Sequence, residues 1–419
     1  MNFNLISALI FCCFFASIKS QHQKQQPKVA IIGAGVAEDG WLQLGAQYID
    51  GNKNPLFDIA KNLGVVDYTV EDYEHLDISE IRYGNCPIQE SDIEAFKDFI
   101  APLNDNYRYV AENDEKKSYD ETIKRMYDKD YANFLKLSLR TMTEWDVLDG
   151  NDVSYSTTKT GYTAILSYLS SKIPTSKFHL NYRIANINFS GEETKLTLAN
   201  GTVINEEFNY VIVTTALGHL KKFARKMFIP QLPDRLLKAI DKIGMGTSEK
   251  IFLEYSDTTW MDTFLTPLPV PGCQGQNEVG EIEMEFNTFQ KVSWTPNVIM
   301  AWIAGHGPEK VDKISDKELS KILTKLFQNI YLNTSIPEPL AIIRSKWTQN
   351  DLFGGSYSYV SYEQAQSRIR HSDLSIPVIK DGKIRIQFAG EATHHQMFQT
   401  AVGALLSGRR ESDRIIYNI

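Results

Sequence analysis

A short apolar run followed by two glycines is the first stretch whose residue types suggest chemistry. Val29 to Ile32 precede Gly33 and Gly35, and a strand followed by Gly-x-Gly opens the turn on which dinucleotide-binding domains hold a pyrophosphate. In that motif a third glycine packs the next helix, whose terminal amides meet the phosphates. Here Glu38 stands at the third position, and no acidic ribose ligand follows about 20 residues later. Taken alone, the stretch is more typical of a plain strand and turn.

A second glycine-containing turn lies near the C-terminus. The run KIRIQF predicts a strand that leads into Gly390 and Glu391, and a helix is predicted to begin near Thr400. Small residues at a helix start, such as Ala401 and Gly403, let a flat ligand approach, and the amides there suit a carbonyl or phosphate group. Tight packing of this helix against a sheet explains the small residues equally well.

A lysine and several aromatic residues are the other candidates. Lys250 leads into the apolar run IFLEY. Such a lysine is usually a solvated strand end, whereas a functional lysine would have to lie in a largely dry pocket. Tyr357 and Tyr359 alternate along a predicted strand, and Trp347 precedes them. Alternating aromatics most often pack a core, but they also wall a slot for a flat cofactor or a cationic ligand.

The elements that must position these residues alternate between strand and helix. Period-two alternation broken by Asn-Gly predicts an antiparallel ribbon over 178–204, and the β-branched run at 210–217 predicts a buried strand. Further strands are predicted at 250–256 and 297–304, and helices at 162–173, 316–331 and 401–419. This order predicts a nucleotide-binding domain built from separated segments, with an α+β domain inserted between them.

Length, composition and charge limit the class of protein. A chain of 419 residues that is 42% hydrophobic can bury large cores and is long enough for two domains. Its net charge of −8 gives no indication of nucleic acid or of an anionic membrane as a partner. No residue cluster predicts a metal site, and nothing in the sequence indicates an oligomeric state.

The N-terminus predicts export. Leu5 to Ile18 form an apolar stretch of signal-peptide length, shorter than the ~20 residues of a membrane span, although an uncleaved anchor is the alternative. We expect the signal peptide to occupy residues 1–20 and the protein to be secreted. Cys86 and Cys273 would then remain, either as one disulfide or as two free thiols. Three triplets fit N-glycosylation acceptors, at Asn188, Asn200 and Asn333.

Six segments, taken together and in this order, resemble the flavin-containing amine oxidases, and within them the polyamine oxidases of the spermine-oxidase type. They are KVAIIGAGVA, WLQLGAQYIDG with NPLFDIAKNLG, NYVIVTTALGHLKK, IDKIGMGTSEKIFLEY, RSKWTQNDLFGGSYSYV and FAGEATHHQMFQTAVGALLSGRRESDRII. These segments extend from Lys28 to Ile416, and their combination is highly specific.

The resemblance implies an α/β fold in which a Rossmann-like FAD-binding domain, truncated here, carries an inserted α+β substrate domain. We expect the FAD-binding domain at 28–75, 155–245 and 380–419 and the substrate domain at 76–154 and 246–379. The implied cofactor is FAD, and the implied substrates are dioxygen and a polyamine such as spermine or an N-acetylated polyamine. The resemblance implies that a hydride would pass from the carbon beside the amine nitrogen to flavin N5. The imine would then hydrolyse to an aldehyde and a shorter amine, and dioxygen would reoxidise the flavin to give hydrogen peroxide.

The resemblance also implies roles for single residues. Lys250 is the expected catalytic residue and holds a water against flavin N5. Glu391 matches a residue near the FAD pyrophosphate and ribose, and Trp347 matches a tryptophan that contacts the flavin. Thr400 and Ala401 match positions on the flavin and substrate side of the final helix.

The other implied contacts divide between cofactor and substrate. Ile184 matches a backbone contact to adenine. Tyr357 and Tyr359 fall where the family places an aromatic wall of the substrate slot. Gly33, Gly35 and Gly390 belong to the cofactor-binding turns.

Two departures from the family pattern affect these expectations. Asp50 stands where the family carries a histidine near the substrate amine, and a carboxylate there would pair with an ammonium group and shift specificity and pH dependence. Between Ala37 and Trp41 the family has the third glycine, a helix, a second strand with its acidic ribose ligand, and a segment rich in arginine and glycine. Roughly 30 residues, one βαβ unit, are missing here.

Four hypotheses follow from these features. The chain is a secreted FAD-dependent polyamine oxidase, or a non-catalytic member of the family with a broken FAD site. The third hypothesis is that the chain is a splice form or an incomplete gene model of an active enzyme. Another flavin monoamine oxidase or an L-amino-acid oxidase is the further alternative, although no segment identifies the arginine that would clamp an amino-acid carboxylate.

Overall fold

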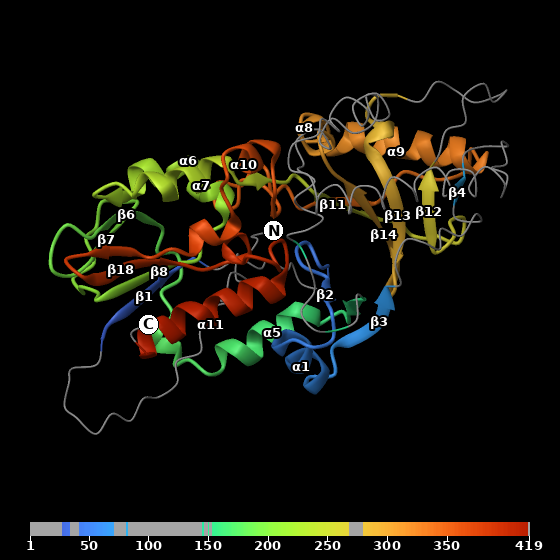
Figure 1. Cartoon of the computed structure of the whole chain (residues 1–419). Helices are drawn as coiled ribbons and strands as arrows, with labels where there is room; N and C mark the ends of the chain where they lie inside the picture. The colour runs from blue at the N-terminus through green and yellow to red at the C-terminus, as the bar shows by residue number, and fades with distance from the viewer. Residues whose placement is uncertain are drawn as a thin grey trace. The chain divides into compact units, whose positions relative to one another are not determined.

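The computed structural model of the protein describes residues 27–33, 42–70, 81–82, 145, 150, 153–267 and 280–417 (Figure 1). The chain forms two compact units. One comprises Met1–Val70, Lys136–Met245 and Asn350–Ile419, and the other Glu71–Leu135 and Gly246–Gln349. The predicted signal peptide, Gly35, the junction at Ala37, Cys86 and Cys273 lie outside the described residues, so the predictions for them stay predictions.

A four-stranded sheet lies at the centre of the first unit, in the order β1–β8–β18–β17. The first three strands run parallel and β17 runs antiparallel. β1 and β8 consist largely of apolar and β-branched residues, as expected where both faces of a parallel sheet are covered. They comprise β1 (Val29–Ile32), β8 (Tyr210–Val213), β18 (Lys383–Phe388) and β17 (Val378–Lys380). This sheet confirms the predicted α/β fold.

Helices cover both faces of this sheet (Figure 1). Ile32 packs in one core with side chains of α6 and α7, whereas the neighbouring Ile31 faces the other side and packs near Ile415 of α11. Successive residues of a strand point to opposite faces, so this alternation follows directly from the strand geometry. The three helices are α6 (Leu217–Met227), α7 (Asp234–Lys242) and α11 (Ala401–Tyr417).

Smaller elements surround this sheet within the first unit. The predicted antiparallel ribbon is confirmed by the pairing of β6 with β7, and β9 joins β6 in parallel. A further three-stranded sheet has the order β2–β5–β3, and β10 pairs with β16. Their strands are β2 (Tyr48–Asp50), β3 (Val66–Val70), β5 (Ser154–Thr157), β6 (Ile184–Asn188), β7 (Lys195–Leu198), β9 (Phe228–Ile229), β10 (Gly244–Met245) and β16 (Ser358–Tyr359). The helices are α1 (Pro55–Asn62), α5 (Gly161–Ser170), α10 (Tyr362–Gln366) and the 3-10 turns η4 (Thr175–Lys177), η6 (His371–Ser375) and η7 (Glu391–Thr393).

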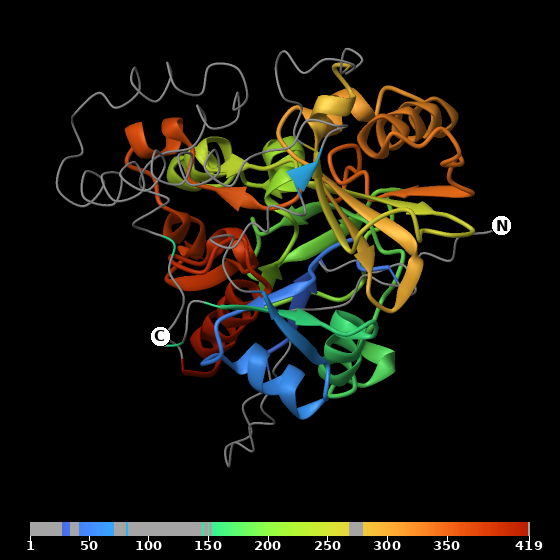
Figure 2. The same cartoon turned by 90° about the vertical axis from the view of Figure 1, so that its right-hand side faces the viewer.

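The second unit is built on a six-stranded sheet in the order β15–β11–β14–β13–β12–β4. The helix α9 lies beside this sheet (Figure 2). Leu323 and Phe327 of α9 belong to the same core as Ile251 and Ile299 of the sheet. Ser315 caps α9, because its hydroxyl accepts a hydrogen bond from the Glu318 amide. The elements are β4 (Ile81–Arg82), β11 (Glu249–Glu254), β12 (Phe264–Pro267), β13 (Phe286–Val292), β14 (Thr295–Ile303), β15 (Ala341–Arg344), η5 (Glu283–Glu285), α8 (Gly307–Val311) and α9 (Asp316–Tyr331).

The chain returns to the first unit at Asn350, which differs from the boundary at residue 380 expected from the sequence. Contacts of the intervening residues explain the difference. Ser361 donates a hydrogen bond from its hydroxyl to the Lys242 carbonyl at 2.6 Å, and the guanidinium of Arg235 is 2.6 Å from the Asp373 carboxylate. In the described ranges, none of the helices combines the length and apolar character needed to cross a membrane.

The start of α11 is held by local contacts. The Thr400 hydroxyl donates to the Met397 carbonyl at 2.8 Å and accepts from the Gly403 amide at 2.9 Å, which makes Thr400 the cap of the helix. A Cβ atom placed on Gly403 would lie 1.9 Å from the Met397 carbonyl oxygen. Close packing of the preceding turn therefore explains the small residue at this position without any ligand.

Replacement of Gly403 by alanine tests this packing. We expect the Gly403→Ala variant to lower the free energy of unfolding by about 1–3 kcal/mol, because backbone must move to admit the methyl group. Urea unfolding measures the change. Gly191→Ala is the matched control, since its Cβ would meet an ordinary contact at 3.5 Å, and we expect a change within about 0.5 kcal/mol. Equal losses in the two variants would contradict the packing argument.

Candidate functional site

Three parallel strands end at one edge of the central sheet. Gly33 follows β1, Thr214 follows β8, and Ala389 with Gly390 follows β18. The Thr214 amide donates to the Ile32 carbonyl at 2.7 Å, and the Ala389 amide donates to the Val213 carbonyl at 3.0 Å. Open α/β sheets bind ligands outside the carboxyl ends of their strands. This carboxyl edge is therefore the place in the first unit where a cofactor site is expected.

Gly33 lies against the next strand end at the carboxyl edge. Its φ is +115°, and a Cβ atom there would lie 2.7 Å from the Thr215 amide nitrogen and 2.9 Å from the Thr214 hydroxyl. Only glycine fits this position. The hydroxyl of Thr215 is buried and has no hydrogen-bond partner among the described residues. A buried hydroxyl beside a glycine backbone fits a polar group of a bound cofactor, since buried polar atoms are normally hydrogen-bonded.

Glu391 lies in the turn after β18 and accepts three hydrogen bonds. The Ser358 hydroxyl donates to Oε2 at 2.6 Å, the Ser358 amide to Oε1 at 3.1 Å, and the Gln399 amide to Oε2 at 2.8 Å. Desolvation raises the pKa of Glu391, and these hydrogen bonds oppose that rise. The preceding Gly390 has a φ of +130°, and its amide donates to the Ser407 hydroxyl of α11 at 2.8 Å.

The turn between Glu391 and α11 brings several predicted residues together. Gln399 adopts a positive φ of +72°, which turns its amide toward the Glu391 carboxylate immediately before Thr400 and Ala401. Thr400 is buried, and Ala401 is partly exposed at the first position of the helix. The structure thus places Gly390, Glu391, Thr400 and Ala401 around one turn.

Lys250 lies in β11 of the second unit, where it is 2% exposed. It is opposite Trp302 of β14, and its ammonium nitrogen is 4.7 Å from the centre of the indole ring. A cation over an indole face gains electrostatic attraction from the ring quadrupole. The interpretation of Lys250 as a solvated strand end is therefore wrong. Its side chain instead lies in the dry surroundings that a functional lysine requires.

Trp347 follows β15 in a segment tied to the same strand as Lys250. The Lys250 amide donates to the Ser345 hydroxyl at 3.0 Å, and the Ser345 amide donates to the Lys250 carbonyl at 3.0 Å. Thr348 donates from its hydroxyl and its amide to the Glu249 carboxylate, at 2.7 and 3.1 Å. Burial raises the pKa of Glu249, against the effect of these hydrogen bonds. The segment that holds Trp347 is fixed beside Lys250.

Tyr357 and Tyr359 differ in their surroundings. Tyr357 is 40% exposed. The ring of Tyr359 covers Gly244, since a Cβ atom there would lie 2.4 Å from the ring. Burial raises the pKa of Tyr359. The residue between them, Ser358, is fully buried. The expected role of the two tyrosines in a substrate slot stays a prediction.

Two further candidates lie on other sheets of the first unit. Ile184 is the first residue of β6 and is partly buried against the core that contains α6 and α7. Asp50 ends β2 and accepts a hydrogen bond from the Ser154 hydroxyl at 2.7 Å. The structure does not place either residue in the Glu391 turn, and their assignments to adenine and to the substrate amine stay predictions.

Three polar residues in or beside the Glu391 turn were not among the candidates. Ser358 and His371 lie beside Glu391, and both are buried. The His394 ring nitrogen Nδ1 accepts from the Met397 amide at 2.8 Å and from the Gln396 amide at 3.2 Å. The adjacent pair His394-His395 was visible in the sequence, whereas only the tertiary structure brings His371 to this place.

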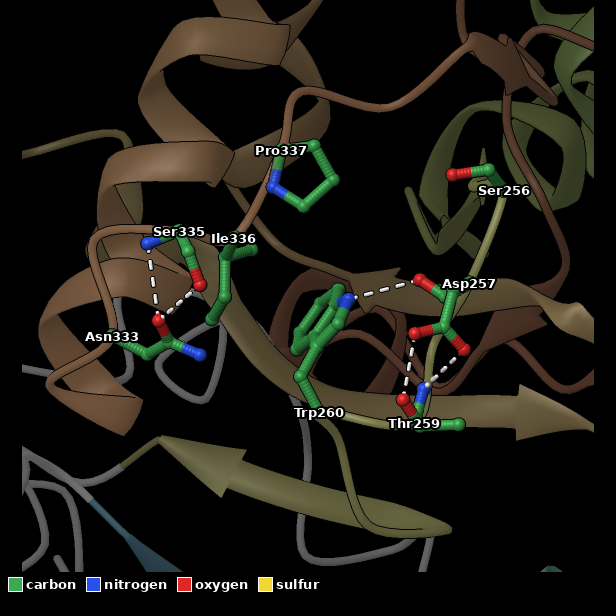
Figure 3. A pocket seen from close by; sticks show the side chains of 8 residues that line it. All are labelled: Ser256, Asp257, Thr259, Trp260, Asn333, Ser335, Ile336 and Pro337. Atoms are coloured by element: carbon green, nitrogen blue, oxygen red, sulfur yellow. Dashed lines mark hydrogen bonds between the residues drawn. The ribbon is translucent and has the colours of Figure 1, made fainter.

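A surface hollow of about 320 Å³ in the second unit is lined by eight residues, namely Ser256, Asp257, Thr259, Trp260, Asn333, Ser335, Ile336 and Pro337 (Figure 3). The carboxylate of Asp257 accepts from the Thr259 hydroxyl and amide, and these hydrogen bonds lower the pKa of Asp257. Asn333 accepts from the Ser335 amide and hydroxyl in the same way (Figure 3). The hollow contains none of the predicted catalytic or cofactor-binding residues.

Comparison with known proteins identifies the family. Residues 124–416 match the family described as "Flavin containing amine oxidoreductase". The "Peroxisomal N(1)-acetyl-spermine/spermidine oxidase" of Homo sapiens is 30% identical over 309 residues, and that of Bos taurus is 29% identical over the same length. In both cases the match covers 67% of this chain and 58% of the relative, so the chain spans just over half the length of these relatives.

A solved structure shows the same fold. The wild-type putrescine oxidase bound to putrescine matches with a TM-score of 0.64 at 15% sequence identity, over 94% of this chain and 99% of that one. At this identity the likeness concerns the fold alone. It agrees with the α/β fold that the family resemblance implied.

His394 offers a test of the Glu391 turn by pH. Desolvation lowers its pKa to about 4, and His395 and Arg410 add to this effect. The unfolded chain therefore binds the proton between about pH 6.5 and pH 4 while the folded chain does not, so stability falls as the pH drops through this window. A shift of this size corresponds to about 3 kcal/mol. Urea unfolding at a series of pH values measures it.

The matched variants for this test are His394→Asn and His179→Asn. In the first variant the side-chain oxygen of the introduced asparagine would accept from the same amides without titrating, so we expect it to lose most of the pH dependence between pH 6.5 and 4. The exposed His179 of the same unit, which does not contribute to the shift of His394, serves as the control, and its variant should retain that dependence. An unchanged pH profile in His394→Asn would show that this imidazole does not hold the turn.

Proposed function

Because the chain belongs to the flavin-containing amine oxidoreductases, we propose that it carries the site of an FAD-dependent oxidase of polyamines. The family match and the two relatives named as N(1)-acetyl-spermine/spermidine oxidases support this proposal. The structural observation that carries it is the burial of Lys250, a charged side chain 2% exposed with its ammonium over an indole ring. A lysine kept in such surroundings is a group suited to proton and water handling in catalysis.

Each unit, taken by itself, contains described residues to which we assign a proposed role. In the first unit, the carboxyl edge at Gly33, Thr215 and Glu391 would hold the cofactor, and bound FAD would supply the electron acceptor. Tyr357 and Asp50 also belong to the first unit. Tyr357 would contact the aliphatic chain of the amine substrate, and Asp50 would pair with one of its ammonium groups. In the second unit, Lys250 would hold a water by donating a hydrogen bond from its ammonium group.

The net reaction proposed for a secondary amine consumes dioxygen and water. The bond between the nitrogen and the oxidised carbon breaks, the carbon leaves as an aldehyde, and the nitrogen leaves with the shorter amine. Two electrons and two protons pass to dioxygen, which becomes hydrogen peroxide. Which polyamine is used is decided by the assay that follows.

Peroxide release from a panel of amines tests the proposed activity. With FAD added, we expect peroxide from spermine, spermidine or their N-acetylated forms and little from L-leucine. Lys250→Met keeps the length of the side chain but removes its ammonium group, and we expect kcat to fall by about 10²-fold or more. A horseradish-peroxidase-coupled assay measures the rates.

The control for this assay is Lys238→Met, a lysine on the exposed side of α7 that should leave the rates unchanged. Preferential oxidation of L-leucine would favour the amino-acid oxidase alternative. Equal rates in Lys250→Met and in the unmodified chain would contradict the proposed catalytic role of Lys250.

We also propose a second candidate, in which this chain is a family member or variant whose FAD site is broken. Among the described strands, β1 is at the edge of the central sheet and pairs only with β8. The family resemblance places a further helix and strand after Ala37, and a pyrophosphate would lose the amides of that helix. An exon in the genomic or another transcript sequence, located between codons 37 and 38 and skipped here, would explain the gap as a splice form or an incomplete gene model.

Flavin stoichiometry decides between the two candidates. We expect the chain as given to bind FAD weakly and to purify with a flavin-to-protein ratio well below one. The flavin is released by heat and its absorbance is compared with the protein concentration. A yellow protein with a ratio near one would contradict the second candidate and support an intact site.

A further inference from the structure

We infer that His371 is a positioning residue that holds the Glu391 carboxylate and the turn at Phe398–Gln399 before the last helix. This inference deepens the proposed function, because it concerns the turn to which that function assigns the cofactor. His371 lies in η6 and is 1% exposed. It acts on Glu391 through two separate sets of contacts.

The first set is a chain of hydrogen bonds. The His371 ring nitrogen Nε2 is 3.2 Å from the Ser358 hydroxyl, and that hydroxyl donates to Glu391 Oε2 at 2.6 Å. Ser358 is fully buried, so its hydroxyl has no water to use instead. Because a serine hydroxyl has a single hydrogen, donation to Glu391 requires that His371 donate to the hydroxyl oxygen.

Gln364 fixes the imidazole in the form that can make this donation. Its side-chain nitrogen is 3.2 Å from His371 Nδ1, and its side-chain oxygen accepts from the Ser361 amide. The amide nitrogen of glutamine can only donate, so Nδ1 is the acceptor and Nε2 carries the hydrogen. Gln364 is itself held in a capping box with Ser361 at the start of α10. The hydrogen bonds therefore run in one direction, from Gln364 through His371 and Ser358 to Glu391.

The second set of contacts passes through Phe398. The imidazole of His371 stacks on this ring, with 4.1 Å between the centroids and 11° between the planes. Phe398 is fully buried, and the next residue, Gln399, has the positive φ that directs its amide to Glu391. A non-glycine residue keeps such a backbone conformation only where its surroundings enforce it. The stacked ring contributes to that enforcement separately from the hydrogen bonds through Ser358.

The two sets of contacts leave part of the carboxylate available. Glu391 Oε2 accepts from Ser358 and from Gln399, while Oε1 accepts from the Ser358 amide. A carboxylate oxygen can accept about two hydrogen bonds. His371 therefore orients Glu391 so that Oε1 can receive a hydroxyl or an N–H of a bound ligand.

Two substitutions at His371 separate the contacts. His371→Phe retains an aromatic ring against Phe398 but removes the donor to Ser358. His371→Gln places an amide nitrogen near the position of Nε2 and restores that donor without the ring. His179→Phe, at an exposed histidine of the same unit, is the matched control for the loss of an imidazole.

Hydrogen–deuterium exchange of the segment 397–402, measured by mass spectrometry without FAD, reports on positioning alone. We expect His371→Phe to speed exchange of the Gln399 amide by about 10-fold, because the carboxylate that accepts this hydrogen is no longer fixed. His371→Gln should restore the exchange rate to within about 3-fold of the unmodified chain. Ser358→Ala breaks the same chain of hydrogen bonds and replaces His371→Phe if that variant does not fold.

FAD binding is then measured on the same variants by the quenching of flavin fluorescence. We expect His371→Phe to raise the FAD dissociation constant by about 10-fold, and His371→Gln to raise it less. Unchanged exchange in folded His371→Phe and Ser358→Ala would overturn the inference. Faster exchange combined with normal FAD affinity in Glu391→Gln would keep the positioning role and reject the proposed cofactor contact of Glu391.

Discussion

The buried carboxylate of Glu411 is the interaction on which the arrangement of the first unit depends. Glu411 is fully buried in α11, and it is paired with Arg410 and Arg414 of the same helix. The Gln387 side chain of β18 donates to its carboxylate at 3.0 Å and to its carbonyl at 3.1 Å. Arg410 also donates to the Phe388 carbonyl at 2.9 Å and to Thr393. A buried charge is tolerated only with such partners, and here the partners fix the last helix to the strand that precedes the Glu391 turn.

That attachment explains why one turn can hold so many constrained residues. The turn from Gly390 to Thr400 begins at β18 and ends at α11, and Glu411 ties those two elements together. Gly390 and Gln399 both adopt positive φ values within it. Strained backbone of this kind persists where the surroundings determine it, and it is common at ligand sites. The same turn contains the hydrogen bonds of Ser358 and Gln399 to Glu391.

Local patterns were enough to predict the strands β1, β8, β11, β14 and β18, the antiparallel ribbon and the helices α9 and α11, because each depends on the spacing of its own apolar residues. Lys250 shows the limit of such patterns. Its burial is set by Trp302 on a neighbouring strand, which no local spacing reveals. Alternation likewise singles out the two tyrosines, whereas Ser358 between them is the fully buried residue. The capping box of Ser361 and Gln364 could have been predicted from the sequence, but its link to His371 depends on the fold.

Lys250 and Glu391 illustrate two ways of keeping a charge out of water, and both bear on function. Removing an ionised group from water is unfavourable, and apolar residues of similar size often give equal or greater stability. The attraction to the indole of Trp302 offsets part of the desolvation free energy of Lys250. Three hydrogen bonds offset part of that of Glu391. A charge at Lys250 is not needed to form β11, since the next three positions of that strand, Ile251 to Leu253, are buried apolar side chains. Residues retained at such a cost to stability are candidates for chemistry, and this argument supports the proposed oxidase site independently of the family match.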